Sequence, residues 1–150
     1  MSQMRPALLL LALVLAGGCS TKTSDRNLQL LDTPDAVQLS NKGSVLFIDP
    51  RSPKEFATAH LPNAINMPFA RGFEDAAAEN IHPSNVVIVY ATSAQDVLGV
   101  AASKRLMELG YADIYTLRGG LRQWIRAGKP VEGVDPDSIE PPTPSLENLN

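Results

Sequence analysis

The stretch Val45-Leu46-Phe47-Ile48-Asp49-Pro50-Arg51-Ser52 is an apolar run that ends in a charged turn. A second run, Val86-Val87-Ile88-Val89-Tyr90, is followed by a short polar loop from Ala91 to Asp96. Short apolar runs bounded by turn signals are typical of strands buried on both faces of a sheet, so we expect the two runs to face each other across one sheet. Ligands of open α/β sheets bind beyond the carboxyl ends of the strands. The loop that begins at Ala91 is therefore the first place to look for function.

Strand and helix patterns alternate between residues 28 and 131. Strands are expected at 28–31, 45–49, 64–67, 86–90 and 113–117, and helices at 33–41, 52–59, 69–80, 97–109 and 121–127. Ser52, Pro53 and Glu55 have the pattern of a capped helix start. This alternation predicts an α/β fold, a single domain with a central, mostly parallel sheet of four to five strands flanked by helices on both faces.

The composition is that of one ordinary globular domain. The chain has 150 residues, of which 44% are hydrophobic and 19% charged, and its formal net charge is −3. This length suffices for one hydrophobic core. No basic cluster favours a nucleic-acid partner, and a single cysteine rules out metal sites built from cysteine pairs. We expect no cofactor.

The first 18 residues have the pattern of a targeting segment. Pro6–Ala16 is an apolar run of 11 residues, shorter than the roughly 20 that a membrane-spanning helix needs. It fits the apolar core of a signal peptide. The segment Leu15-Ala16-Gly17-Gly18-Cys19 resembles a bacterial lipoprotein signal, which implies removal of residues 1–18 and acylation of Cys19. An ordinary secretory peptide followed by a chance cysteine is the alternative.

The lipoprotein resemblance also implies a location in the bacterial cell envelope. Acyl chains on Cys19 would make the lipid bilayer a partner of the protein. Ser20 after the cysteine resembles the pattern of lipoproteins sent to the outer membrane, where the domain would face the periplasm. Residues 19–27 would then be the lipidated cysteine and a polar tether. Cys19 is the only cysteine, so the mature protein would carry no free thiol.

The composition changes again at residue 132. The segment 132–150 contains four prolines and five carboxylates, with neither lysine nor arginine. Acidic, proline-rich segments bury too little apolar surface to fold alone. We expect this tail to be extended or disordered.

Four segments in chain order resemble the rhodanese-homology domain family. Residues 47–56, which contain Asp49 and Arg51, resemble its first signature, and residues 60–68 resemble its histidine-proline-alanine turn and strand. Residues 117–124 resemble its closing glycine pair and tryptophan helix, and 127–131 its exit. The resemblance covers residues 28–131 and implies a rhodanese-like domain. In active members of that family, a cysteine takes sulfur from a donor such as thiosulfate and holds it as a persulfide.

The resemblance also implies where that cysteine would be. In active members it follows the strand that matches Val86–Tyr90, and the residue at this position here is Ala91. The matching loop consists of Ala91, Thr92, Ser93, Ala94, Gln95 and Asp96, where active members commonly carry arginine and glycine. A methyl group is no nucleophile, and Asp96 would repel an anionic donor. We therefore expect no catalytic residue in this chain.

Two hydroxyl groups of the loop are weaker candidates for catalysis. Thr92 or Ser93 would need a positioned base, and neither His60 nor His82 lies in the loop. Hydrogen bonding within the loop is the simpler role. The two histidines also lack the spacing of a metal site with a carboxylate, so we expect no metal.

Asp49 and Arg51 have two interpretations. They could contact a ligand at the carboxyl edge of the sheet, or they could form a structural ion pair that also includes Glu55. The structural interpretation is the one we favour.

Together these features predict a membrane-anchored envelope lipoprotein whose rhodanese-like domain lacks the catalytic cysteine. Such a domain would serve as a non-catalytic binding or regulatory module, with another envelope protein as a partner. One alternative is a sulfurtransferase component that relies on a partner's thiol. A second is a structural envelope protein with a vestigial pocket.

Overall fold

Every strand and helix predicted between residues 28 and 131 is present in the computed structural model, which describes residues 23–139. The strands are β1 (Gln29–Leu31), β2 (Val45–Asp49), β3 (Ile65–Asn66), β4 (Val86–Val89) and β5 (Ile114–Leu117). The helices are α1 (Thr33–Lys42), α2 (Pro53–Thr58), α3 (Phe73–Asn80), α4 (Leu98–Glu108) and α5 (Gly120–Arg126), with short 3₁₀ turns η1 (Asp25–Asn27) and η2 (Pro136–Ser138). The predicted α/β class is confirmed.

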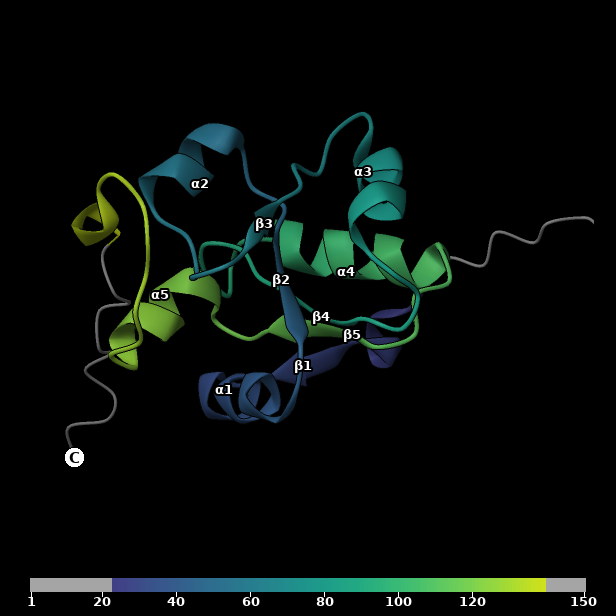
Figure 1. Cartoon of the computed structure of the whole chain (residues 1–150), viewed down its shortest axis with the longest axis horizontal. Helices are drawn as coiled ribbons and strands as arrows, with labels where there is room; N and C mark the ends of the chain where they lie inside the picture. Colours follow the sequence, from purple (N-terminus) through teal and green to yellow (C-terminus); the bar gives the residue numbers. More distant parts are fainter. Residues whose placement is uncertain (1–22, 140–150) are drawn as a thin grey trace, which may run out of the picture.

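The five strands form one parallel sheet in the order β1-β5-β4-β2-β3 (Figure 1). The two apolar runs are neighbours in it, because Val45 to Ile48 of β2 pair with Val86 to Val89 of β4. Helices cover both faces: α3 and α4 lie on one side of the sheet, and α1 and α5 on the other (Figure 1).

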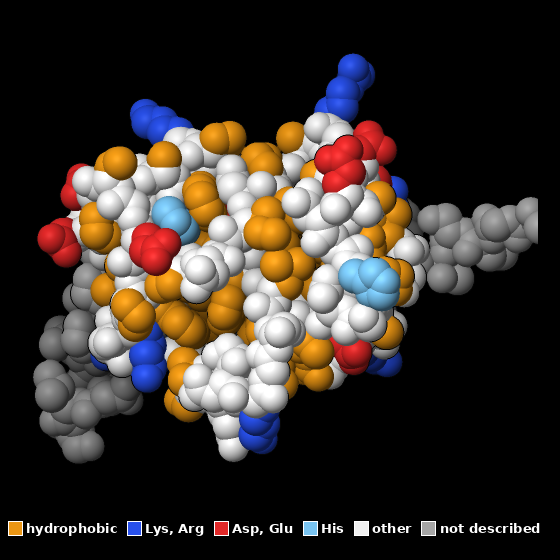
Figure 2. Space-filling model, viewed as in Figure 1, with side chains coloured by type: hydrophobic (Ala, Val, Ile, Leu, Met, Phe, Trp, Pro, Cys, Tyr) orange, Lys and Arg blue, Asp and Glu red, His pale blue; other side chains and the backbone are white. Residues whose placement is uncertain are grey.

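Each face of the sheet buries its own hydrophobic cluster. Val87 and Val89 of β4 belong to the cluster under α3 and α4, and Ile88 and Tyr90 to the cluster under α1 and α5. This division follows from the alternation of side chains along a strand. All four side chains are fully buried, so β4 is the centre of the core. Figure 2 shows hydrophobic side chains in the hollow between α1 and α5 and acidic ones over α3.

Two helix starts test the local predictions. The capping box at α2 is confirmed, because the Ser52 hydroxyl accepts a hydrogen bond from the Glu55 amide and the Glu55 carboxylate accepts one from the Ser52 amide. The helix expected to begin at Phe69 begins instead at Phe73. Gly72 has a φ of 89°, and this left-handed conformation keeps the preceding turn out of the helix.

The end of the expected tether packs against the domain. Residues 1–22 lie outside the described part of the chain, so the predicted signal peptide and Cys19 do too. Within the described part, Asp25 forms an ion pair with Lys104, and the Thr23 amide donates to the Glu108 carboxylate. No helix within residues 23–139 combines the length and apolar character needed to cross a membrane.

The beginning of the predicted tail is also held against the domain. His60 and Glu132 exchange two backbone hydrogen bonds of 2.8 and 2.9 Å, and the Val134 amide donates to the Ala57 carbonyl at 2.9 Å. Residues 132–139, which were expected to be extended or disordered, are therefore hydrogen-bonded to the end of α2 and to His60. The rest of the tail, residues 140–150, lies outside the described part of the chain.

Candidate functional site

The loops after β2, β4 and β5 meet at the carboxyl edge of the sheet. The chain leaves β4 toward α4 on one face and leaves β5 toward α5 on the other face. Such a reversal opens a crevice between the two strands, and this is where ligands bind in open α/β sheets. The loop from Ala91 to Asp96 lies at this crevice, as the sequence predicted from the strand that precedes it.

The beginning of α5 holds the start of this loop. The Leu121 amide donates to the Ala91 carbonyl at 2.8 Å, and the Arg122 amide donates to the Thr92 carbonyl at 3.0 Å. Gly120 makes this approach possible, since it has a φ of 58° and a Cβ there would lie 2.3 Å from the Ala91 carbonyl oxygen. Ala91 as a whole residue is only 3% exposed.

Asp96 takes up two of the amide groups around the loop. Its carboxylate accepts hydrogen bonds from the Thr92 amide at 3.1 Å and from the Leu98 amide at 3.0 Å. The Leu98 amide belongs to the first residue of α4, where the helix dipole favours a negative charge. The Asp96 carboxylate therefore occupies the position toward which the Thr92 and Leu98 amides point.

A hollow of about 130 Å³ opens beside Ala91. Its lining residues include Leu30, Ala91, Asp96, Gly99, Val100 and Thr116. The buried Thr116 hydroxyl donates to the Ser103 hydroxyl at 2.7 Å, so it is already partnered within the fold. The floor of the hollow is thus mainly apolar and carries no thiol.

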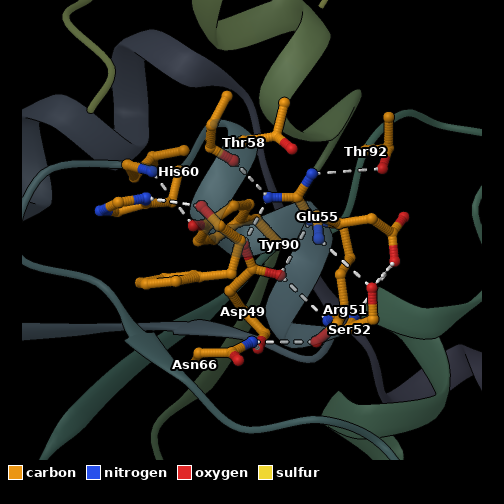
Figure 3. A network of polar contacts seen from close by, with 12 residues as sticks. Asp49, Arg51, Ser52, Glu55, Thr58, His60, Asn66, Tyr90 and Thr92 are labelled. Atoms are coloured by element: carbon orange, nitrogen blue, oxygen red, sulfur yellow. Dashed lines mark hydrogen bonds and ion pairs between the residues drawn. The ribbon is translucent and has the colours of Figure 1, made fainter. Parts of the chain in front are cut away.

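Asp49 and Arg51 form a buried ion pair at the end of β2 (Figure 3). Two hydrogen bonds join the side chains: Arg51 Nε donates to Asp49 Oδ1 at 2.9 Å, and Arg51 Nη2 donates to Asp49 Oδ2 at 2.5 Å. The same guanidinium donates to the Ala59 carbonyl at 2.7 Å. Burial alone would lower the pKa of Arg51, but the hydrogen bonds and charge of Asp49 outweigh burial and raise it. Both residues are as buried as the hydrophobic core, with 0% exposure for Asp49 and 1% for Arg51.

Tyr90 completes this polar network. Its hydroxyl accepts a hydrogen bond from the Leu61 amide at 3.1 Å, and the Arg51 guanidinium lies 5.8 Å from the centre of its ring. Burial, followed by the charge of Asp49, raises the pKa of Tyr90 well above its ordinary value. The Tyr90 hydroxyl therefore stays protonated in the folded protein, and its oxygen accepts the hydrogen bond from the Leu61 amide in the loop after α2.

The network connects to the neighbouring loops more loosely. Asn66 donates to the carbonyls of Asp49 at 3.0 Å and Arg51 at 2.9 Å. Arg51 reaches the Thr92 hydroxyl only at 3.5 Å, at the limit of a hydrogen bond. The donors and acceptors of Asp49 and Arg51 are thus directed mainly at each other and at the backbone. This arrangement fits a structural role better than contact with a ligand.

The remaining sequence candidates lie apart from one another. Glu55 bonds to Ser52 rather than to Arg51, so the ion pair does not extend to it in the way expected. His60 stacks on Phe56, with ring centres 3.9 Å apart, while the exposed His82 bonds to Ser84. Within residues 23–139, the structure brings no three His, Cys, Asp or Glu side chains into a group that could hold a metal ion.

Sequence reasoning missed three residues that shape this site. Gly99 packs against the floor, because a Cβ there would lie 3.5 Å from the Ala91 Cβ. The sequence indicated Gly120 only as part of the glycine pair within residues 117–124, and no pattern indicated a role for the Tyr90 hydroxyl. The glycine pair 119–120 could have indicated a close backbone contact. No signal in the sequence links Tyr90 to Leu61, which lies 29 residues earlier.

Comparisons with known proteins agree with this fold. A match to the Rhodanese-like domain family covers residues 32–127. A protein named sulfurtransferase from Allochromatium vinosum is 30% identical over 94 residues, which are 63% of this chain and 84% of that protein. The thiosulfate sulfurtransferase GlpE of Vibrio cholerae is 28% identical over 68% of this chain and 92% of its own length.

Solved structures show the same likeness. The rhodanese-like domain of an Anabaena protein has a TM-score of 0.62 at 22% identity, over 77% of this chain and 86% of its own. A Bacillus halodurans protein has a TM-score of 0.63 at 24% identity, over 70% of this chain and 77% of its own. At these identities the structures establish the fold alone.

Proposed function

This chain belongs to the rhodanese-like domain family, and from that premise we propose that it is a non-catalytic binding or regulatory module. The observation that carries the proposal is the methyl group of Ala91. It lies at the end of β4, at the crevice where the fold presents groups to ligands. Sulfur transfer through a persulfide needs a thiolate at such a place, and carbon cannot supply one.

Asp96 supports the same proposal independently. Its carboxylate accepts two amide hydrogen bonds around the loop, at 3.1 and 3.0 Å. A donor such as thiosulfate carries negative charge and would meet this fixed carboxylate. The loop therefore lacks the thiol that would accept sulfur, and the negative charge of Asp96 opposes the binding of an anionic sulfur donor.

The test is a thiosulfate:cyanide assay on the full chain in a mild detergent. We expect no thiocyanate above that formed by a heat-denatured sample. GlpE of Vibrio cholerae, assayed in the same detergent, checks that the conditions allow sulfur transfer. Steady turnover by the wild-type chain would refute the non-catalytic role.

A sulfurtransferase role with a partner's thiol is the second candidate, because two of the relatives are named as sulfurtransferases. In this version the domain would position a partner protein that carries the persulfide. Adding this chain to a persulfide-carrying protein should then speed sulfur transfer to cyanide. An unchanged rate across several such proteins would argue against it.

The second part of the proposal concerns location. We propose that Cys19 is acylated after removal of residues 1–18 and anchors the domain to the envelope, at the outer membrane facing the periplasm. The lipoprotein-like segment from Leu15 to Cys19 supports it. Labelled palmitate should be incorporated into the wild type but not into Cys19→Ser. A Cys19→Ser protein that still fractionates with outer membranes would contradict the anchor.

A further inference from the structure

Three hollows adjoin at the carboxyl edge of β4 and β5. The first, beside Ala91, measures about 130 Å³, and the other two about 300 and 190 Å³. Ala94 and Gly119 line all three. The hollows therefore adjoin one another around Ala94 and Gly119 and form one depression between the loop 91–96, the beginning of α1 and the exposed side of α5.

The first hollow has the size and character of a site for one apolar side chain. Small-molecule pockets measure about 300–1,000 Å³, so this hollow is too small for a whole metabolite. An apolar cavity of roughly 150 Å³ holds a benzene ring. Leu30, which lines this hollow, is 45% exposed. An incoming apolar group would thus cover apolar surface both inside the hollow and around it.

The third hollow carries positive charge. It is lined by Arg122 and Arg126, which are exposed on α5 and make no ion pair within residues 23–139. The amides of Ser93, Ala94 and Gln95 border the same hollow and donate no hydrogen bond to another described residue. The chain as a whole has a net charge of −3, so this patch is opposite in sign to the rest.

Opposing charges near the depression are already engaged. Asp96 accepts the Thr92 and Leu98 amides. Asp32 lies 3.4 Å from Arg118, and both of these side chains are more than half exposed. Within residues 23–139, Arg122 and Arg126 therefore line the depression without an ion-pair partner, and the partner that complements both these charges and the apolar hollow is acidic with an apolar anchor.

We propose that this depression docks an acidic, extended peptide segment of a partner protein. One aliphatic side chain of the segment enters the hollow beside Ala91, and its carboxylates lie against Arg122 and Arg126. The inference rests on the proposed binding function and names the partner's chemistry. An extended segment suits adjoining hollows, because successive side chains of the segment point in different directions and can enter separate hollows.

The test uses a fluorescent, end-blocked peptide of sequence Asp-Glu-Leu-Glu-Asp and the full chain in a mild detergent. We expect saturable binding by fluorescence anisotropy that weakens as salt is raised. Replacing the leucine of the peptide by serine should weaken binding about tenfold or more, because the buried aliphatic group is lost. Equal binding of the two peptides would overturn the proposal.

Variants of the protein locate the site. Arg122→Glu combined with Arg126→Glu should weaken binding at least about tenfold, and both changes are on the surface, where the fold tolerates them. Lys42→Glu is the matched control, since Lys42 ends α1 at the opposite edge of the sheet, and it should leave binding unchanged. Amide NMR signals of Ser93, Ala94 and Gly119 should shift with the peptide. Shifts confined to other regions would refute the assignment.

The two proposals fail in different ways. Thiocyanate formation by the same preparation would overturn the non-catalytic function, whether or not the peptide binds. Absence of peptide binding in a preparation without turnover would overturn the acidic-peptide inference alone.

Discussion

The loops after β2 and β4 leave neighbouring strands at the same edge of the sheet, yet their side chains are used differently. At the end of β2, Asp49 and Arg51 are nearly inaccessible and direct most of their hydrogen bonds at each other and at the Ala59 carbonyl. After β4, Ala91 offers only a methyl group, and Ala94 and Gln95 face solvent. One loop is fixed by buried charge, and the other is an open surface.

The contrast distinguishes residues that the stability of the fold requires, such as the ion pair of Asp49 and Arg51, from residues such as Ala91 that can change at less cost to stability. A buried ion pair cannot lose one partner without leaving a charge in a medium of low polarity. A methyl group at the floor of a hollow imposes no such penalty. The domain can therefore keep its architecture while the residues of the loop after β4 change, as the proposed binding function requires.

The largest effect is expected from breaking the ion pair after β2. Arg51→Ala leaves the Asp49 carboxylate buried without a counter-charge and should lower the free energy of unfolding by about 3–5 kcal/mol. Arg118→Ala is the control, because its pair with Asp32 is exposed and should contribute less than about 1 kcal/mol. Urea unfolding of both variants measures the difference. Similar losses would mean that the loop after β2 is no more firmly held than the surface.

A second test concerns the contact that holds the open loop. Gly120→Ala would place a methyl group against the Ala91 carbonyl and should cost about 2–3 kcal/mol of unfolding free energy. Gly128 also has a positive φ, of 67°, but nothing lies within 4 Å of the position of its Cβ. Gly128→Ala therefore measures the backbone cost alone, about 1–2 kcal/mol. If the two variants unfold alike, close packing of α5 does not hold the loop.

Tyr90→Phe probes the hydroxyl in the buried network. The change leaves the Leu61 amide without its acceptor and should cost about 1–3 kcal/mol. Tyr115→Phe is a suitable control, since Tyr115 lies in the adjacent strand and makes no side-chain hydrogen bond within residues 23–139. Chemical denaturation at neutral pH compares the two.

The same variant carries a pH dependence. The folded-state pKa of Tyr90 is raised, first by burial and then by Asp49. Its contribution to stability is therefore complete below the pKa of an unfolded tyrosine, about 10, and is lost as pH rises above it. The wild type should lose stability between about pH 9 and 11 more steeply than Tyr90→Phe. Parallel curves would indicate that the hydroxyl titrates freely in the folded protein.

Much of this architecture could be predicted from the sequence. The runs 45–49 and 86–90 specify buried strands, and Ser52 with Glu55 specifies a helix start, because these signals are local. The site was predictable only in outline. The sequence places Ala91 after a strand, but the bond from Tyr90 to Leu61 and the contact from Gly120 to Ala91 join residues far apart in the chain. Such contacts are fixed by packing, not by local pattern.

Asp96 gives the clearest example of this limit. Its charge was expected to oppose an anionic donor, which follows from its residue type. Its hydrogen bonds to the amides of Thr92 and Leu98 depend on the curvature of the loop, and residue type alone does not determine that curvature. The acidic residue is therefore a cap for the loop as well as a source of repulsion.

A fourth prediction tests this double role by restoring the thiol. Ala91→Cys alone should form a persulfide only slowly, by thiolate attack on the outer sulfur of thiosulfate with release of sulfite, because the Asp96 charge raises the pKa of a nearby thiol and repels the donor. Ala91→Cys combined with Asp96→Asn should react about tenfold faster, as expected for a shift of about one pKa unit. Persulfide-selective alkylation followed by mass spectrometry measures both rates. Ala91→Ser with Asp96→Asn provides the baseline without a thiol at residue 91.

The outcome bears directly on the contrast between the two loops. Equal rates for the single and double variants would show that Asp96 has no electrostatic influence on the hollow. Fast reaction of Ala91→Cys alone would mean that the loop retains the whole apparatus for an anionic donor except sulfur, and the binding proposal would lose its electrostatic support.

The smallest effect is expected where the loop after β2 meets solvent. Ser52→Ala removes one side of the capping box at α2 and should cost about 1 kcal/mol of unfolding free energy. Glu55→Ala removes the other side, and because the two bonds support each other, the double variant should cost less than the sum of the single changes. Urea unfolding of the four proteins gives this coupling energy. If the losses of unfolding free energy in the single variants add up to that of the double variant, the two bonds form independently. The stability of this loop would then depend on the buried ion pair of Asp49 and Arg51 alone.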